Sequence, residues 1–345
     1  MIARRPSPPS QLCWVAGVAF ALTCLVGCSA VTSNTAQLVT PAAARAAVVH
    51  HWDLNRRALR ANSASEARRL IEEVEGGDAL RMDEDVIVRE AEARAATHST
   101  PPPIPDAGAI RVFVPRQSGY PAVFISVRKQ LASNPDGAAT DKTTEVLELF
   151  RRASPGATWR NVGYAEIAPG LSARLDLAID RDGYAAFAQG EPGGSQLSNL
   201  YTTYMTAALI GHPEQASPRI AAGPLTDQFA TQIQRGLAAV PSVRRLASFA
   251  NSQHQEGIKL RMADGGTFVL FNNTYQVVTT PVAGGCISAG PGSTVPGSYK
   301  SVTDHFLQDL AAIVGAGSQG PVSLIAESDS VVSVDTKACA GDATI

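Results

Sequence analysis

The spacing of apolar residues changes along the chain from the period of a helix to that of a strand, and no other feature constrains the fold as strongly. Between residues 41 and 74 apolar side chains recur at near-helical spacing with arginines and glutamates between them, which predicts a long helix. Pro41 suits its first turn, and Gly76 and Gly77 are expected to end it. A second, charged helix is predicted over 82–96. We therefore expect a helical segment before any sheet begins.

The proline-rich run at 101–105 separates these helices from segments that alternate between apolar and polar residues. Such alternation is typical of strands that bury one face. The predicted strands are 110–114 and 122–127, joined as a hairpin around 117–120, followed by 145–151 and 158–167. The first half of the chain therefore predicts helices followed by an antiparallel sheet.

The second half repeats this order. It opens with a short hairpin across Asp180 to Gly183 and contains the clearest hairpin of the chain, which turns at Asp264-Gly265-Gly266. The predicted strands are 174–179, 184–188, 258–262, 267–279 and 322–334, and the predicted helices are 197–210, 226–239 and 298–314.

We therefore predict an α+β fold of two similar halves, residues 41–168 and 169–345, each with helices packed on an antiparallel sheet. A helix folded against a curved antiparallel sheet is the cystatin-like or NTF2-like arrangement. We expect that arrangement here by analogy.

The N-terminus has the features of an export signal. Arg4 and Arg5 precede an almost wholly apolar run at 11–27. The run ends in Leu25-Val26-Gly27-Cys28, which resembles the lipobox of bacterial lipoprotein precursors. The resemblance implies a signal peptide at 1–27, a lipid on the Cys28 thiol and a flexible tether at 28–40. It places the protein on the extracytoplasmic face of the cell membrane, held there by that lipid.

Two alternatives to lipidation at Cys28 stay open. An apolar run of about seventeen residues lies at the lower edge of what spans a bilayer, so a retained membrane anchor or a cleaved signal without lipid would also fit. Cys24 is a poorer lipidation site, because Leu22 and Thr23 precede it where small residues are required. No second apolar run of this length follows, so we expect the remaining chain to be water-soluble.

Cys286 and Cys339 are the cysteines that remain after processing, apart from Cys28. An even pair in an oxidising compartment predicts a disulfide, although two free thiols are the alternative. The bond would close a loop of about fifty residues and stabilise the fold by roughly 4 kcal/mol in the chain-entropy view.

Several short segments together resemble an uncharacterised lipoprotein family of high-GC Gram-positive bacteria that carries a domain of unknown function. They are residues 52–58 (WDLNRRA), 74–77 (VEGG), 182–185 (DGYA), 221–226 (AAGPLT) and 263–266 (ADGG). The resemblance implies an envelope location and leaves the activity open.

No motif in the chain predicts a catalytic site, a metal site or a cofactor. Asp180 to Gly183 is not expected to bind calcium, because Ala178 and Gln189 would occupy the first and twelfth ligand positions. His50 and His51 lack further ligands at metal-binding spacing, so we interpret them as a helical pair. Nucleophile-elbow, zinc-protease and nucleotide-binding motifs are absent from the sequence.

Charge adds a further restriction. Loss of residues 1–27 removes two of the 29 basic residues and none of the 31 acidic ones, which leaves a formal charge of -4 and favours no nucleic-acid partner. The acidic group of Glu72, Glu73 and Glu75, next to Arg68 and Arg69, is interpreted as a solvated helix face.

We expect a non-enzymatic envelope protein that binds a small amphiphile or a protein partner in the concavity of a curved sheet. One alternative is an envelope hydrolase whose site is assembled only in the fold. Another is a structural or assembly subunit without a ligand.

Overall fold

The computed structural model describes residues 37–99, 109–133, 139–190, 192–212, 218–252, 257–282, 284–289, 295, 297–317 and 320–339. Residues from Gln37 onward form one compact unit. The signal peptide, Cys28 and most of the predicted tether lie outside the described residues.

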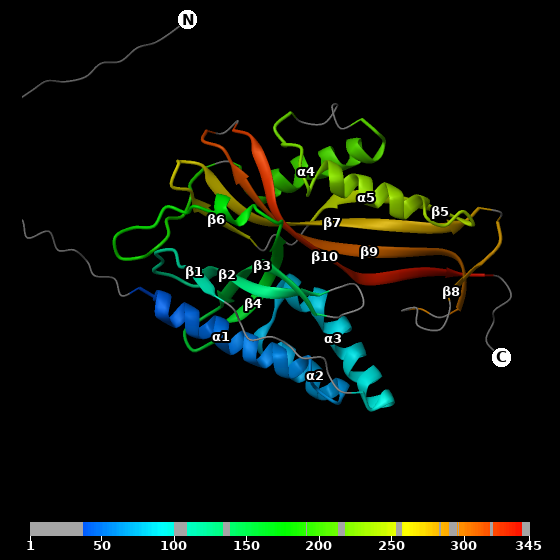
Figure 1. The fold of residues 1–345 in the computed structure, drawn as a ribbon, viewed down its shortest axis with the longest axis horizontal. Coiled ribbons are helices and arrows are strands. Elements are labelled where there is room, and N and C mark those ends of the chain that lie inside the picture. The colour runs from blue at the N-terminus through cyan, green and yellow to red at the C-terminus, as the bar shows by residue number, and fades with distance from the viewer. Residues whose placement is uncertain are drawn as a thin grey trace, which may run out of the picture. The chain divides into compact units, whose positions relative to one another are not determined.

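The described chain is an α+β protein with a large antiparallel sheet (Figure 1). The helices are α1 (Pro41–Ala58), α2 (Ala64–Val74), α3 (Gly77–Thr97), α4 (Gly194–Leu209) and α5 (Asp227–Ala238), with a short 3-10 turn at Ser172–Arg174. The strands are β1 (Ile110–Phe113), β2 (Ala122–Ser133), β3 (Ala139–Arg152), β4 (Arg160–Ile167), β5 (Val243–Asn251), β6 (Ile258–Arg261), β7 (Thr267–Pro281), β8 (Ile287–Ala289), β9 (Gly297–Val314) and β10 (Val322–Ala338).

The long helix predicted over 41–74 is divided into α1 and α2. Thr40 caps α1, since its Oγ1 accepts a hydrogen bond from the amide of Ala43 at 3.1 Å. Ser63 starts a new helix in the same way, accepting from the amide of Glu66 at 3.3 Å. A hydroxyl that caps the first turn favours a helix start over continuation. The break allows α2 to fold back, so that Leu54 of α1 shares a core with Leu70 of α2.

The sheet joins both halves of the chain. Its strand order is β1-β2-β3-β4-β10-β9-β7-β5, with β6 also paired to β7 and β8 to β9. The junction between β4 and β10 consists of the pairs Ile167↔Ala326 and Glu166↔Glu327. These pairs lie across the boundary predicted at 168–169.

Residues 298–314, predicted as a helix, form strand β9, so that prediction is wrong. The strand pairs along its length with β7 on one side and β10 on the other. Every residue from Leu307 to Val314 is buried, because this part of the strand is covered on both faces. A strand buried on both faces has no alternation of apolar and polar residues, so its apolar spacing resembles that of a helix.

Two further segments differ from the prediction. Strand β5 was not predicted, although its burial alternates between partly buried and exposed positions. The hairpin predicted over 174–188 is reduced to single bridges. Ile179 pairs with Ala185 across the expected turn, but Leu177 and Phe187 pair with Met262 and Leu260 instead.

Successive side chains of β7 enter different cores because strand residues alternate between faces. Leu270 packs with Ile125 and Leu147 of β2 and β3. Phe271 packs on the other side with Tyr201 and Met205 of α4. Helices α1–α3 lie on one side of the strands and α4–α5 on the other (Figure 1). Within the described residues, no helix is long and apolar enough to cross a membrane.

Candidate functional site

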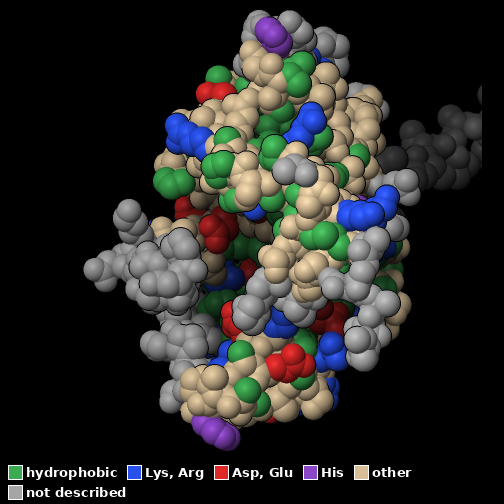
Figure 2. Space-filling view, turned by 90° about the vertical axis from the view of Figure 1, so that its right-hand side faces the viewer, with side chains coloured by type: hydrophobic (Ala, Val, Ile, Leu, Met, Phe, Trp, Pro, Cys, Tyr) green, Lys and Arg blue, Asp and Glu red, His purple; other side chains and the backbone are tan. Residues whose placement is uncertain are grey.

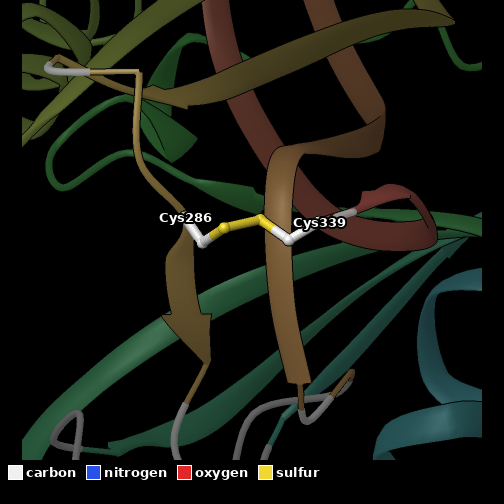
Figure 3. Close-up of a disulfide and its surroundings, with 2 residues drawn as sticks. All are labelled: Cys286 and Cys339. Atoms are coloured by element: carbon white, nitrogen blue, oxygen red, sulfur yellow. A yellow bond between two sulfur atoms is a disulfide. The ribbon is translucent and has the colours of Figure 1, made fainter. Parts of the chain in front are cut away.

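The two cysteines of the predicted disulfide lie at disulfide distance, with a Cα–Cα separation of 6.2 Å, and their sulfur atoms are bonded (Figure 3). Cys286 directly precedes β8, and Cys339 directly follows β10. Because β8 pairs with β9 at Ile287↔Tyr299, the bond ties the end of β10 to the strand on the far side of β9. Lipidation at Cys28 lies outside the described residues.

The carboxylates of the 180–183 turn bind an arginine. Asp180 Oδ2 accepts from Arg116 Nε at 2.6 Å, and Asp182 Oδ2 accepts from Arg116 Nη2 at 2.5 Å. The other oxygen of Asp180 accepts the amides of Asp182 and Tyr184 at 2.9 and 3.0 Å. The side chains that suggested a calcium loop therefore stabilise a turn. Within the described residues, no group of three or more His, Cys, Asp and Glu side chains is arranged to hold a metal ion.

The histidine pair is divided between solvent and interior. His50 is exposed, whereas His51 is buried and its Nε2 lies 3.3 Å from Glu75 Oε1. The same carboxyl oxygen accepts from Asn55 Nδ2 at 3.1 Å. Burial lowers the pKa of His51 below its usual value, although the charge of Glu148 acts in the opposite direction.

Glu75 is not on a solvated helix face, so that interpretation is wrong. Helix α2 ends at Val74, and Glu75 adopts an extended conformation that bridges to Asn161 of β4. This turns the side chain inward, and Glu75 is only 1% exposed. Burial raises its pKa to about 8, and the hydrogen bond from Asn55 opposes that shift only in part.

Asp83 is the second carboxyl group of this cluster, and it interacts with Glu75 directly. It comes from α3, is partly buried, and accepts a hydrogen bond from the hydroxyl of Tyr164 of β4 at 2.7 Å. Burial and the neighbouring charge of Glu75 raise the pKa of Asp83 to about 8. The two carboxyl groups therefore retain protons near neutral pH.

A salt bridge completes the cluster on the sheet side. Glu148 Oε1 accepts from Arg128 Nη2 at 3.0 Å and from Nε at 3.2 Å, and Glu148 Oε2 accepts from the Ser126 hydroxyl at 2.6 Å. Burial alone would raise the pKa of Glu148, but Arg128, His51 and Ser126 outweigh it and hold the pKa below its usual value. The guanidinium of Arg128 also stacks over Trp52 of α1, 3.9 Å from its ring.

Helix α3 is also tied to the C-terminal strands. Asp78 accepts a hydrogen bond from Asn272 of β7. Asp309 of β9 accepts the amide of Tyr164 at 2.9 Å, next to Gly163. These polar residues are together called the polar cluster, which consists of His51, Glu75, Asp78, Asp83, Arg128, Glu148, Tyr164, Asn272 and Asp309. The polar cluster joins α1 and α3 to strands from both halves.

A pocket of about 310 Å³ lies outside the polar cluster, at one edge of β7. Strands β6 and β5 pair with the same edge, over 267–270 and 273–281, and the pocket lies where β6 begins. It is lined by Val123, Phe187, Ala188, Gly193, Gly194, Gly257, Ile258, Lys259, Val269, Leu270 and Phe271. Five separate short runs of residues form it, and no sequence motif marks any of them.

On the described part of the face in Figure 2, basic, acidic and hydrophobic side chains are interspersed. Val282, a large exposed hydrophobic residue, lies at a second pocket of about 440 Å³. This pocket is lined by Gln234, Leu237, Ala238, Val243, Arg244, Arg245 and Val282.

Residues 35–335 match the family model of DUF8094, a domain of unknown function. This confirms the expectation that the body of the chain is a domain of unknown function. No curated protein and no solved structure matches the chain.

Proposed function

The chain belongs to the DUF8094 family of domains of unknown function, and we propose that this member is a non-enzymatic, lipid-anchored envelope protein that binds a small amphiphile. The pocket at the edge of β7 carries the proposal, because its walls are mainly apolar and it has one charged side chain, Lys259, among the lining residues described. Its volume of about 310 Å³ is within the range of small-molecule sites.

The walls of the pocket come from both groups of strands. Val123 of β2 forms one wall, and Ile258 and Leu270 of β6 and β7 form another. Ile258 and Leu270 belong to the core that packs between β2–β4 and β6–β7, with Val123 packed against it. A bound apolar chain would thus extend this core outward.

Binding can be tested with the neutral fluorophore N-phenylnaphthylamine, which brightens in apolar surroundings. Ala188→Phe should fill the pocket and abolish the signal. Ala250→Phe, at an exposed position on β5, is the matched control and should leave it unchanged. Equal binding by both variants would place the fluorophore elsewhere and contradict the proposal.

Lipid attachment at Cys28 is the second part of the proposal. It is supported by the lipobox resemblance and by the Cys286–Cys339 pair, since disulfides persist in oxidising compartments. Cys28→Ser should lose the mass of the acyl chains and shift from the membrane to the soluble fraction. Unchanged mass and fractionation would refute it.

We also propose that the fold consists of two similar units. In each half, helices pack on antiparallel strands, α1–α3 in the first and α4–α5 in the second, and this supports two similar units with a cystatin-like or NTF2-like arrangement. Residues 41–168 expressed alone should give a dispersed amide spectrum. A spectrum typical of an unfolded chain would count against the two-unit description.

One observation favours an envelope hydrolase as a second candidate. The Glu75–Asp83 pair retains protons near neutral pH, and a protonated carboxyl group can act as a general acid. Chromogenic esters and glycosides are suitable substrates for a first test. Turnover that disappears in Asp83→Asn but persists in Asp85→Asn, a change at an exposed site on the same helix, would support this candidate. No turnover by the parent would count against it.

A further inference from the structure

We propose that the amphiphile carries an anionic head group and that Lys259 recognises it. This inference rests on the proposed function, because it concerns the ligand of the same pocket. It narrows that ligand to single-chain acidic amphiphiles and excludes cationic ones.

The position of Lys259 in β6 is the first step. Its neighbours Ile258 and Leu260 are buried, 5% and 0% exposed, in the core between the two parts of the sheet. Because alternate residues of a strand point to opposite faces, Lys259 points away from that core. Its side chain is partly buried at the pocket and extends toward the 187–190 segment, where Nζ donates to the carbonyl of Gly190. The hydrogen bond places the ammonium group at the Gly190 side of the pocket, on the opposite face of β6 from Ile258 and Leu260.

The charge of Lys259 is the second step. A carbonyl oxygen accepts one hydrogen bond from the ammonium group but brings no negative charge, and an ammonium group has three donors. Among the described lining residues no acidic side chain faces it. An anionic head group can therefore accept a charge-assisted hydrogen bond from this ammonium group.

The shape of the ligand follows from the rest of the lining. Val123, Phe187 and Leu270 provide apolar contact for a short chain, and Lys259 supplies the polar end. The volume of about 310 Å³ suits a single chain of moderate length rather than a two-chain lipid. The matching ligand is a monoanionic amphiphile, with a carboxylate as the simplest head group.

Three probes with the same ten-carbon chain separate the contribution of the head group to affinity from that of the apolar chain. Decanoate, decanol and decyltrimethylammonium are titrated below their micelle concentrations against the full processed chain loaded with N-phenylnaphthylamine. We expect decanoate to displace the fluorophore at a concentration about tenfold lower than decanol, which corresponds to about 1.4 kcal/mol. Decyltrimethylammonium should be the weakest, and salt should reduce the advantage of decanoate.

Two variants test whether Lys259 causes the preference for decanoate over decanol. Lys259→Met keeps the apolar stem and should bind decanoate and decanol equally, whereas the exposed control Lys300→Met should keep the tenfold preference. Equal binding of decanoate and decanol by the parent, or a preference that persists in Lys259→Met, overturns the inference. Both outcomes leave chain binding intact. If the fluorophore does not bind to the parent at all, the proposed function fails instead.

Discussion

His51 and Glu75 contact each other in the interior, with His51 Nε2 at 3.3 Å from Glu75 Oε1. This contact joins α1, which contains His51, to the short link between α2 and α3, which contains Glu75. Burial lowers the pKa of the imidazole and raises that of the carboxyl group to about 8, so both groups favour their neutral forms near neutral pH. The contact therefore adds little net charge to the interior at that pH. Because these groups titrate at a different pH in the unfolded chain, the free energy of unfolding depends on pH.

The free energy of unfolding should fall as the pH rises from about 5 to about 8. In the unfolded chain Glu75 and Asp83 lose their protons near 4.5 and 3.8, but in the folded protein they keep them until about 8. Because the folded state holds more protons in this window, stability declines by about 1.4 kcal/mol per pH unit for each proton retained. Urea titrations at several pH values measure the slope.

Glu75→Gln should reduce that slope, because the amide stays neutral at every pH. Glu72→Gln, at an exposed position on α2, is the matched control and should keep the slope of the parent. A slope that is identical in all three proteins would show that Glu75 does not retain a proton.

Removal of Arg128 should destabilise the fold strongly. Arg128→Met leaves the buried carboxylate of Glu148 without its cation, a change that typically costs about 3–5 kcal/mol. The double variant Arg128→Met/Glu148→Leu should recover much of that loss, because no charge remains buried. Arg68→Met at the exposed Arg68–Glu84 pair should cost less than about 1 kcal/mol. Chemical denaturation decides among these outcomes, and equal losses at the two sites would contradict the assignment.

The Cys286–Cys339 bond should stabilise the protein by about 4 kcal/mol, because it closes a loop with a sequence separation of 53. A Cys286→Ser/Cys339→Ser variant should unfold at a lower urea concentration, and reductant should shift the parent to the same midpoint. The variant itself should be insensitive to reductant. A parent that does not respond to reductant would contradict this expectation.

Gly163 should not tolerate a larger side chain. A Cβ atom there would lie 2.9 Å from Asp309 Oδ2, the oxygen that accepts the amide of Tyr164. Gly163→Ala should therefore displace Asp309 and cost about 1–3 kcal/mol. Gly119→Ala has open space around the new atom and should leave the unfolding midpoint nearly unchanged. Similar midpoints for the two variants would contradict the expected clash.

The sequence predicted those elements whose neighbours lie close along the chain. Helices α4 and α5 and the β6–β7 hairpin are found near their expected positions, because periodicity and turn residues are local signals. Periodicity and turn residues do not predict an element correctly where segments distant in the sequence bury it. The segment predicted as a helix over 298–314 is strand β9, which pairs with β7 and β10 and is covered on both faces over residues 307–314.

The same reason explains what was missed at the candidate site. Glu75 follows a charged helix and looks solvated in the sequence, but its burial depends on the bridge to Asn161. Lys259 is one charged residue in a short strand, and only the approach of residues 187–188, of residues 193–194 and of Val123 makes it part of a pocket. The disulfide pair was predictable because it needs only cysteine count and compartment.

The final strand of the chain lies in the interior of the sheet order, between β4 and β9. Ile167 of β4 therefore cannot pair with Ala326 until nearly the whole second half of the chain has been synthesised. Until then β4 has an open edge, and the two groups of strands are not joined into one sheet. Loss of β10 through a premature stop codon or a proteolytic cut would divide the sheet between β4 and β9, so it should be far more damaging than the loss of an edge strand.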